Sequence, residues 1–152
     1  MIPIVNAGGN ILNLDKSMLQ QSIDDFYEEI IEEFTKYGEL EDVVVCENLG
    51  DHMIGSVYAK YEDEEHAEKA LNALNGRYFA GRQLSVEYSN VSNFSEARCR
   101  MYDDRRSHCD KGPFCNFMHA LQPCRALKEH CYKTYNYKVK NNKGNASMSG
   151  FR

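Results

Sequence analysis

The sequence of 152 residues has room for one domain of ordinary size and a small second module. Its 42% hydrophobic content can supply one core, and no run reaches the roughly 18 apolar residues of a membrane-spanning helix. The first residues do not show the basic and apolar pattern of a secretory signal peptide, so we expect a reducing compartment. In such a compartment the six cysteines bind metal or remain thiols rather than forming disulfides.

The formal net charge of −5 conceals two segments of opposite sign. Residues 1–97 contain 6 Lys/Arg and 19 Asp/Glu, a net charge of −13, whereas residues 98–152 contain 12 and 4, a net charge of +8. A basic segment suits a phosphate backbone, and an acidic segment repels one. We therefore expect two different partners, with nucleic acid bound by the second segment only.

The first 90 residues predict alternating strands and helices. Apolar residues 2–5 predict a brief strand, and apolar residues spaced by three and four predict a helix from Asp15 or Ser17 to about Tyr37, ended by Gly38. The next elements are expected over residues 40–46 (strand), 53–61 (strand), 63–75 (helix) and 83–88 (strand). The order β-α-β-β-α-β predicts an α+β, ferredoxin-like RRM fold.

The remainder of the chain has a different character. We expect an RRM-like domain over 1–90, a connector over 91–98, a zinc finger over 99–122, a short helix over 123–135 and a disordered tail over 136–152.

The zinc finger is predicted from the spacing C-x9-C-x5-C-x3-H of Cys99, Cys109, Cys115 and His119. Three thiolates and one imidazole form the closed tetrahedral shell that Zn²⁺ prefers in structural sites, with no open position for a catalytic water. The intervening residues are too polar to build a core, so one structural zinc ion would replace it. The ordered spacing and basic flanks disfavour the alternative of three incidental thiols and a surface histidine.

Cations and aromatic rings are interleaved with these ligands, as is typical of a surface that binds single-stranded RNA. For the individual rings, packing within the finger is an equally good explanation. The predicted RNA-binding residues are Arg98, Arg100, Tyr102, Arg105, Arg106, Lys111, Phe114 and Phe117.

The sheet of the RRM-like domain, in contrast, is a poor RNA surface. An RNA-binding RRM displays aromatic rings on its central strands, but here Ser56 stands where the first ring is expected and only Tyr58 remains. The acidic first helix and the Arg77-Tyr78-Phe79 segment after the second helix favour a protein partner on the helical side.

Several stretches carry a specific family resemblance. They are Phe26-Tyr27-Glu28-Glu29, Lys36-Tyr37-Gly38-Glu39, Cys46-Glu47-Asn48-Leu49-Gly50-Asp51-His52, Ala67-Glu68-Lys69-Ala70 and Phe114-Cys115-Asn116-Phe117-Met118-His119. Over about residues 20–125 the chain resembles the small subunits of the U2 snRNP auxiliary factor, U2AF. Their RRM-like domain is a U2AF homology motif, followed by a CCCH zinc finger.

The resemblance implies a nuclear pre-mRNA splicing factor without enzymatic activity. A Trp-containing, Pro-rich peptide of the U2AF large subunit would insert between the two helices and stack on Phe79. Arg77 would pair with one first-helix carboxylate, and the finger would help to recognise the AG of the 3′ splice site. The implied partner-binding residues are Glu28, Glu29, Glu32, Glu33, Arg77, Tyr78 and Phe79.

The sequence departs from the family pattern in four ways. The family carries another CCCH finger ahead of the RRM-like domain and a long Arg-Ser tail, and this sequence shows neither. Tyr78 replaces the usual Trp, which should weaken stacking on the large subunit's prolines. Nine residues rather than seven separate the first two zinc ligands.

Two alternatives remain. A CCCH-type mRNA-binding adaptor acting outside splicing would need no tryptophan-bearing partner. An enzyme with a cysteine or zinc centre is disfavoured, because we find no vacant metal position and no nucleophile–base spacing. Cys46 is expected to be a buried strand residue, and Cys124 and Cys131 packing or spare thiols. The remaining histidines, expected at the surface, are His52, His66, His108 and His130.

Overall fold

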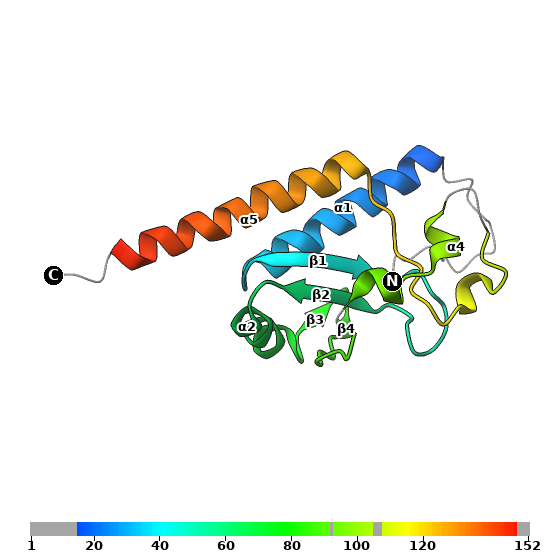
Figure 1. Cartoon of the computed structure of the whole chain (residues 1–152), viewed down its shortest axis with the longest axis horizontal. Helices are drawn as coiled ribbons and strands as arrows, with labels where there is room; N and C mark the ends of the chain where they lie inside the picture. Colours follow the sequence, from blue (N-terminus) through cyan, green and yellow to red (C-terminus); the bar gives the residue numbers. More distant parts are fainter. Residues whose placement is uncertain (1–14, 92, 105–107, 149–152) are drawn as a thin grey trace.

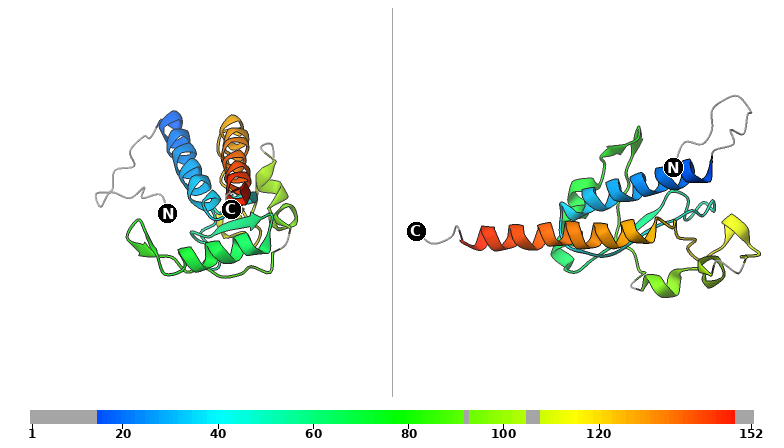
Figure 2. Two further views of the ribbon diagram at one scale, coloured as in Figure 1. Left: turned by 90° about the vertical axis from the view of Figure 1, so that its left-hand side faces the viewer. Right: turned by 90° about the horizontal axis from the view of Figure 1, so that it is seen from above.

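The computed structural model describes residues 15–91, 93–104 and 108–148, with side chains as far as residue 140. Two long helices, α1 and α5, lie side by side on one face of a short antiparallel sheet (Figures 1 and 2). The elements are α1 (Lys16–Thr35), β1 (Leu40–Val45), β2 (Val57–Tyr61), α2 (Glu64–Leu74), β3 (Tyr78–Phe79), β4 (Arg82–Gln83), α3 (Phe94–Ala97), α4 (Arg100–Asp103), the 3-10 helix η1 (Gly112–Phe114) and α5 (Arg125–Met148).

Helix α1 forms where its apolar periodicity predicts it. The Asp15 carboxylate accepts a hydrogen bond from the backbone N–H of Ser17 at 3.4 Å, which satisfies one of the free donors of the first turn. Tyr27 and Ile31 are almost completely buried on the face that meets the sheet and α5. Gly38 follows the helix for a reason other than a left-handed turn, because a Cβ at this position would overlap the ring of His66.

Strands β1 and β2 pair antiparallel, with Val43 opposite Ala59 and Val45 opposite Val57. Val43 and Val45 pack into the core formed with α1 and α5. Strand β2 begins at Val57 instead of the expected residue 53, because the preceding residues form a turn in which Gly55 has a φ of 70°.

The other face of the sheet is covered by the connector after the RRM-like domain. Phe94 of α3 is 6% exposed and packs with Val44, Cys46 and Met118. Its ring meets that of Tyr58 edge-on, at a centroid distance of 6.1 Å. Tyr58, the aromatic residue that the sequence retains at the expected RNA face, therefore lies against the protein's own side chain.

Of the first and last strands of the expected RRM pattern, only the last can be compared with the described structure. Residues 2–5 lie outside the described residues. The extent of the expected strand over 83–88 is wrong, since within the described residues the strand is limited to Arg82–Gln83, which pairs as β4 with β3. Positive φ angles at Ala80 and Gly81 turn the chain back sharply, so Leu84 donates its N–H to the Arg77 carbonyl within this hairpin.

The helix expected over 123–135 is present but continues further, because α5 extends from Arg125 to Met148. The expectation of a disordered tail is therefore wrong for residues 136–148, and residues 149–152 lie outside the described residues. Leu127, Cys131 and Tyr135 pack against the core that α1 shares, and Cys131 has no exposed surface. Once this packing orders the first half of the helix, adding a residue needs no new nucleation. The polar residues 141–145 then continue the helix.

Helix α5 and the segment before it also cover the free edge of β1. The Asn136 side chain accepts from the N–H of Leu40 at 3.1 Å and donates to the Leu40 carbonyl at 2.9 Å. At the other end of the strand, the N–H of Leu121 donates to the Val45 carbonyl at 2.8 Å, and Cys46 bridges to Ala120. Exposed strand edges are prone to mispairing, and this edge is protected. Among the described helices, none combines the length and apolar character needed to cross a lipid bilayer.

Candidate metal centre and partner-binding surfaces

The predicted ligands come together in space. The ligand atoms of Cys99, Cys109, Cys115 and His119 all lie within 4.8 Å of one another, and each of the four residues is buried. Cys99 immediately precedes α4, and Cys115 immediately follows η1. His119 lies in the segment that runs beside the end of β1. This geometry gives a group that could bind a metal ion, as the spacing predicts.

The state of His119 fits a metal ligand. Its Nε2 atom is buried and has no hydrogen-bond partner within the described part of the chain, which is costly unless a ligand satisfies it. Burial lowers the pKa of the His119 imidazole and so favours the neutral form that binds metals. The N–H of Phe117 donates to Cys115 Sγ at 3.4 Å, which helps to fix the position of this sulfur.

Asn48, in the loop after β1, holds two of the ligands in place. Its side chain is completely buried, and its Nδ2 donates to the carbonyls of Cys115 and Phe117, both at 3.0 Å. Its Oδ1 accepts from the backbone N–H of His119 at 2.8 Å. The N–H of Leu49 donates to the Pro113 carbonyl at 2.8 Å. The loop after β1 of the RRM-like domain is therefore hydrogen-bonded directly to the backbone of the finger.

Tyr102 lies inside this module. Its ring stacks on His119 at a centroid distance of 4.1 Å and an interplanar angle of 10°. Its hydroxyl donates to the Glu47 carboxylate, and burial is the main cause that raises its pKa. One face of the ring is thus covered by a metal-ligand candidate.

The other predicted RNA-binding residues differ in their accessibility. Phe114 is 68% exposed and Phe117 is 52% exposed, and Arg100 and Lys111 are also exposed. Arg98 is half-buried, and its guanidinium pairs with the carboxylate of Asp103 at 2.8 Å. Arg105 and Arg106 lie outside the described residues.

A second group of predicted residues meets near the C-terminal end of α1. Arg77 Nη1 lies 2.6 Å from Glu33 Oε1 and donates to the Tyr37 hydroxyl at 2.9 Å. Glu33 is thus the first-helix carboxylate that pairs with Arg77. Hydrogen bonds from Lys36, Arg77 and Tyr37 hold the pKa of Glu33 at about 2.

Aromatic residues adjoin this ion pair. Phe79 is 39% exposed and lies 6.3 Å from the ring of Phe26, at an interplanar angle of 55°. Tyr78, its neighbour in the hairpin, is 72% exposed. Of the remaining predicted carboxylates, Glu29 and Glu32 are exposed. Glu28 instead faces α5, where it accepts a hydrogen bond from the Tyr135 hydroxyl at 3.3 Å.

The other cysteines and histidines behave largely as expected. Cys46 and Cys131 are buried thiols, and Cys124 is exposed. The expectation of a surface histidine is wrong for His66, which is 5% exposed. Its ring lies between Gly38 and Tyr61, and Nδ1 is 3.5 Å from the Asp63 carboxylate.

Two residues of the site are not identified by the sequence patterns. Asn48 belongs to a stretch that predicts only a turn, and its burial depends on contact with residues about 70 positions away. Phe94 belongs to the expected connector, although a lone aromatic residue in a polar linker is a signal of docking. Both residues lie at the joint between the two modules.

Comparison with known proteins agrees with these features. Residues 11–85 match the family model of the RNA recognition motif. The chain is 45% identical over 122 residues to a splicing factor U2af small subunit of Arabidopsis thaliana, covering 80% of this chain and 42% of that protein. It is 43% identical over 123 residues to the splicing factor U2af 38 kDa subunit of Drosophila melanogaster, covering 80% and 46%.

A third relative is the splicing factor U2AF 23 kDa subunit of Schizosaccharomyces pombe, 46% identical over 109 residues, with 72% of this chain and 50% of that protein covered. The chain spans about half the length of the curated relatives it matches. These names are those of splicing-factor subunits and not of enzymes, in agreement with the expectation from sequence. Residues 11–85 of the chain match the RNA recognition motif, and over 72–80% of its length the chain is similar to U2AF small subunits.

Proposed function

We propose that this chain acts in pre-mRNA splicing as a two-sided adaptor in the nucleus. On one side, the surface between α1, α2 and the β3–β4 hairpin binds a Trp-containing, Pro-rich peptide of a U2AF large subunit. On the other side, the finger contacts RNA and helps to recognise the AG of a 3′ splice site. A single structural Zn²⁺ holds the finger together.

The finger side is supported by its exposed groups. Phe114 and Phe117 offer ring faces to unstacked bases, and Arg100 and Lys111 offer charge to phosphates. Arg105 and Arg106 are assigned to the same proposed surface from their position in the sequence alone. Arg98 and Tyr102 would mainly stabilise the finger. Arg98 forms an ion pair with Asp103, and the Tyr102 ring stacks on His119.

Zinc is the ion that this ligand set favours. Three thiolates and one imidazole are soft and borderline donors, and four protein ligands complete a tetrahedral shell. The ion would hold four buried residues whose surroundings contain few apolar side chains. Its role is structural, and RNA contact is left to the surrounding residues.

The partner side carries the proposal most directly. Its central observation is the half-exposed ring of Phe79 beside the Arg77–Glu33 ion pair. Glu29 and Glu32 of α1 are exposed and can meet basic residues of the peptide. A desolvated aromatic contact within a charged rim is the usual composition of an interface hot spot. Glu28 would contribute at the border with α5.

Within the described residues, the sheet face does not compete as an RNA surface, because Phe94 packs edge-on against Tyr58. A protein-binding helical side and an RNA-binding finger are therefore assigned to separate elements. The −13 charge of the first 97 residues agrees with this division.

The test is binding of a Trp-containing, Pro-rich peptide to the whole chain, measured by calorimetry. Phe79→Ala should cost about 2 kcal/mol or more, the usual threshold for a hot spot. Tyr88→Ala, which removes an exposed aromatic ring outside the hairpin, is the matched control and should leave affinity unchanged. Equal affinities of the Phe79→Ala variant and the unchanged chain would overturn the peptide site.

A second measurement tests the RNA side. Cys115→Ser should remove zinc and RNA affinity together, while the peptide still binds. Retention of one equivalent of zinc by the variant would refute the ligand set. Intact RNA binding with no peptide binding would instead support a CCCH-type mRNA-binding adaptor acting outside splicing.

A further inference from the structure

The positive charge of the basic segment, residues 98–152, is not centred on the finger. Residues 98–124 contain 5 Lys/Arg and 3 Asp/Glu, a net charge of +2. Residues 125–152 contain 7 and 1, a net charge of +6. Most of the basic excess that indicates a nucleic-acid partner therefore belongs to α5 and the residues that follow it.

Part of this charge is concentrated on one side of α5. A shallow groove there is lined by Arg125, Lys128, Glu129, Tyr132 and Lys133, which recur at the spacing of one helix face. Lys133 is exposed and has no ion-pair partner among the residues that the structure describes. The Arg125 side chain is 93% exposed, and its contact with Glu129 is a surface pair of the kind that contributes little.

The groove is held at a fixed place on the molecule. Lys128 lies 3.3 Å from the Asp42 carboxylate of β1, and the Tyr132 hydroxyl donates to the same carboxylate at 3.4 Å. The Lys128 ammonium is 5.8 Å from the centroid of the Tyr132 ring. The cations beside this partly buried ring therefore offer phosphate contacts at a fixed position.

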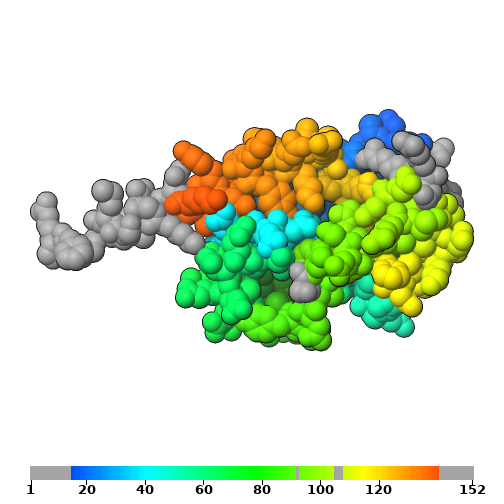
Figure 3. Space-filling model, viewed as in Figure 1, coloured from blue at the N-terminus to red at the C-terminus, as the bar shows by residue number. Residues whose placement is uncertain are grey.

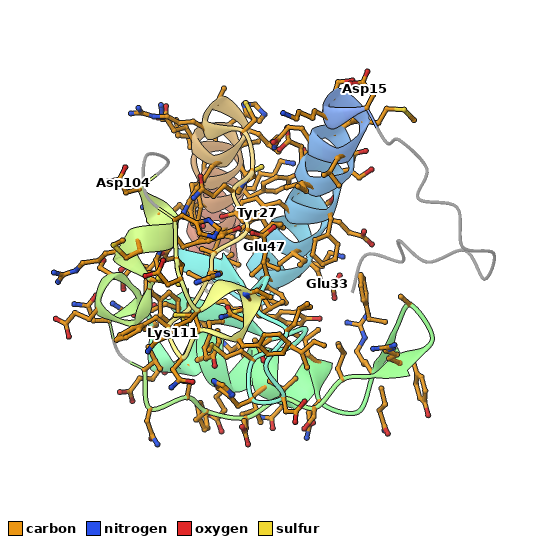
Figure 4. All side chains as sticks on the ribbon, turned by 90° about the vertical axis from the view of Figure 1, so that its right-hand side faces the viewer. Asp15, Tyr27, Glu33, Glu47, Asp104 and Lys111 are labelled. Atoms are coloured by element: carbon orange, nitrogen blue, oxygen red, sulfur yellow. The ribbon has the colours of Figure 1, made fainter. Side chains whose placement is uncertain are left out.

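The first half of α5 also lies close to the finger. The first half of α5 and the finger form one continuous surface in the space-filling view (Figure 3). In the view from the finger end, Asp104 of the finger and the outer side of α5 lie on the same side of the molecule, away from α1 (Figure 4). A strand of RNA leaving the finger can therefore follow α5 without crossing the acidic first helix.

We propose that the Arg125–Lys133 face of α5 is a second RNA-binding surface, which holds the phosphodiester backbone of single-stranded RNA that extends beyond the finger. This inference rests on the proposed RNA contact of the finger. It adds an RNA footprint longer than the finger alone can cover. Its contacts are to phosphates, so it should act equally on all sequences.

The experiment compares RNA binding of the zinc-loaded chain with that of the double variant Arg125→Ala, Lys133→Ala. Both side chains are exposed and neither packs in the core, so the variant should fold normally. The matched control is Lys69→Ala, Arg82→Ala, which removes one Lys and one Arg from exposed positions of the acidic domain. Affinity is measured by fluorescence anisotropy, over a series of salt concentrations, for a short RNA that covers the finger and for a longer one.

For the longer RNA, the α5 variant should bind several-fold more weakly. Its slope of log affinity against log salt should fall by about 0.7 for each phosphate that the variant no longer neutralises. The control variant should match the unchanged chain, and the short RNA should not distinguish any of them. Unchanged affinity and slope for the longer RNA would overturn the α5 surface.

A finger variant, Phe117→Ala, separates this inference from the proposed function. If Phe117→Ala weakens both RNAs and the α5 variant weakens neither, the finger contact stands and the α5 surface is refuted. If Phe117→Ala has no effect on the short RNA, the finger contact itself fails. Weaker binding of the longer RNA only in the α5 variant would then support α5 as an RNA surface that acts without the finger.

Discussion

The side-chain oxygen of Asn48 accepts a hydrogen bond from the backbone N–H of His119 at 2.8 Å, across 71 positions of sequence. The same side chain donates to the carbonyls of Cys115 and Phe117. Since Cys115 and His119 belong to the candidate metal centre, a loop of the RRM-like domain supports the metal module. The two modules are joined at their most buried polar residue.

This joint predicts that Asn48→Ala weakens metal binding without changing any ligand. Loss of groups that orient metal ligands typically lowers affinity by about 10- to 100-fold. The measurement is competition for zinc with a chelator, together with the visible absorption bands of the cobalt-loaded chain, which report the ligand geometry.

Asn136→Ala is the control for this prediction, because Asn136 also spans two backbone groups, those of Leu40, but at the far end of β1. It should lower stability and leave zinc affinity unchanged. Equal zinc affinities of the Asn48→Ala and Asn136→Ala variants would mean that Asn48 serves the fold only.

The Glu33 carboxylate, which accepts hydrogen bonds from Lys36, Arg77 and Tyr37, predicts an acid-dependent contribution to stability. Because the pKa of Glu33 in the folded chain is about 2, below its ordinary value of 4.5, the ionised carboxylate stabilises the fold above pH 4.5. This contribution is lost as the pH falls from 4.5 toward 2. Unfolding by urea should therefore show Glu33→Gln to be less stable at neutral pH, with the difference shrinking across that window.

The comparison for Glu33 is Glu29→Gln, which changes an exposed carboxylate of the same helix. Protonation of the metal ligands at low pH affects both variants alike and cancels in their difference. A Glu33→Gln penalty that stays constant from pH 7 to pH 2.5 would contradict the assignment.

Gly38 and His66 predict a steric coupling between α1 and α2. A Cβ at position 38 would overlap the buried His66 ring, so Gly38→Ala should destabilise the chain by about 1–3 kcal/mol. In the His66→Gly background, which removes the Cβ atom of residue 66 as well as its ring, the same substitution should cost much less, and thermal unfolding of the four proteins measures this coupling. Additive losses would show that the glycine is needed for another reason.

Tyr78 predicts a gain of partner affinity. Its ring is 72% exposed beside Phe79, where it can cover a proline of the bound peptide. Tyr78→Trp should tighten the peptide by roughly 0.5–1.5 kcal/mol, the range of an added aromatic contact. Calorimetry with the unchanged peptide measures the gain, and Tyr78→Ala should move affinity the other way. A tighter Tyr78→Ala variant would place this ring outside the interface.

Local patterns were sufficient for the elements whose signals are repeated within a few residues. The spacing of apolar residues predicted α1 and α2 almost to their ends, and the spacing of three cysteines and one histidine predicted the metal-ligand group. The lengths of β4 and α5 were not predictable in this way. In the described structure β4 pairs with β3 over Arg82–Gln83 alone, and packing against α1 extended the last helix.

Composition and spacing can be read directly from the sequence. They predicted the RRM-like order of strands and helices, the candidate metal ligands and the separation of acidic from basic residues. Three contacts depended on the tertiary structure alone. They are the hydrogen bond between Asn48 and His119, the ring contact between Phe94 and Tyr58, and the ion pair between Glu33 and Arg77. The reason is physical. A contact between residues 36 to 71 positions apart leaves no periodic trace, because its free energy depends on burial that exists only after the chain has folded.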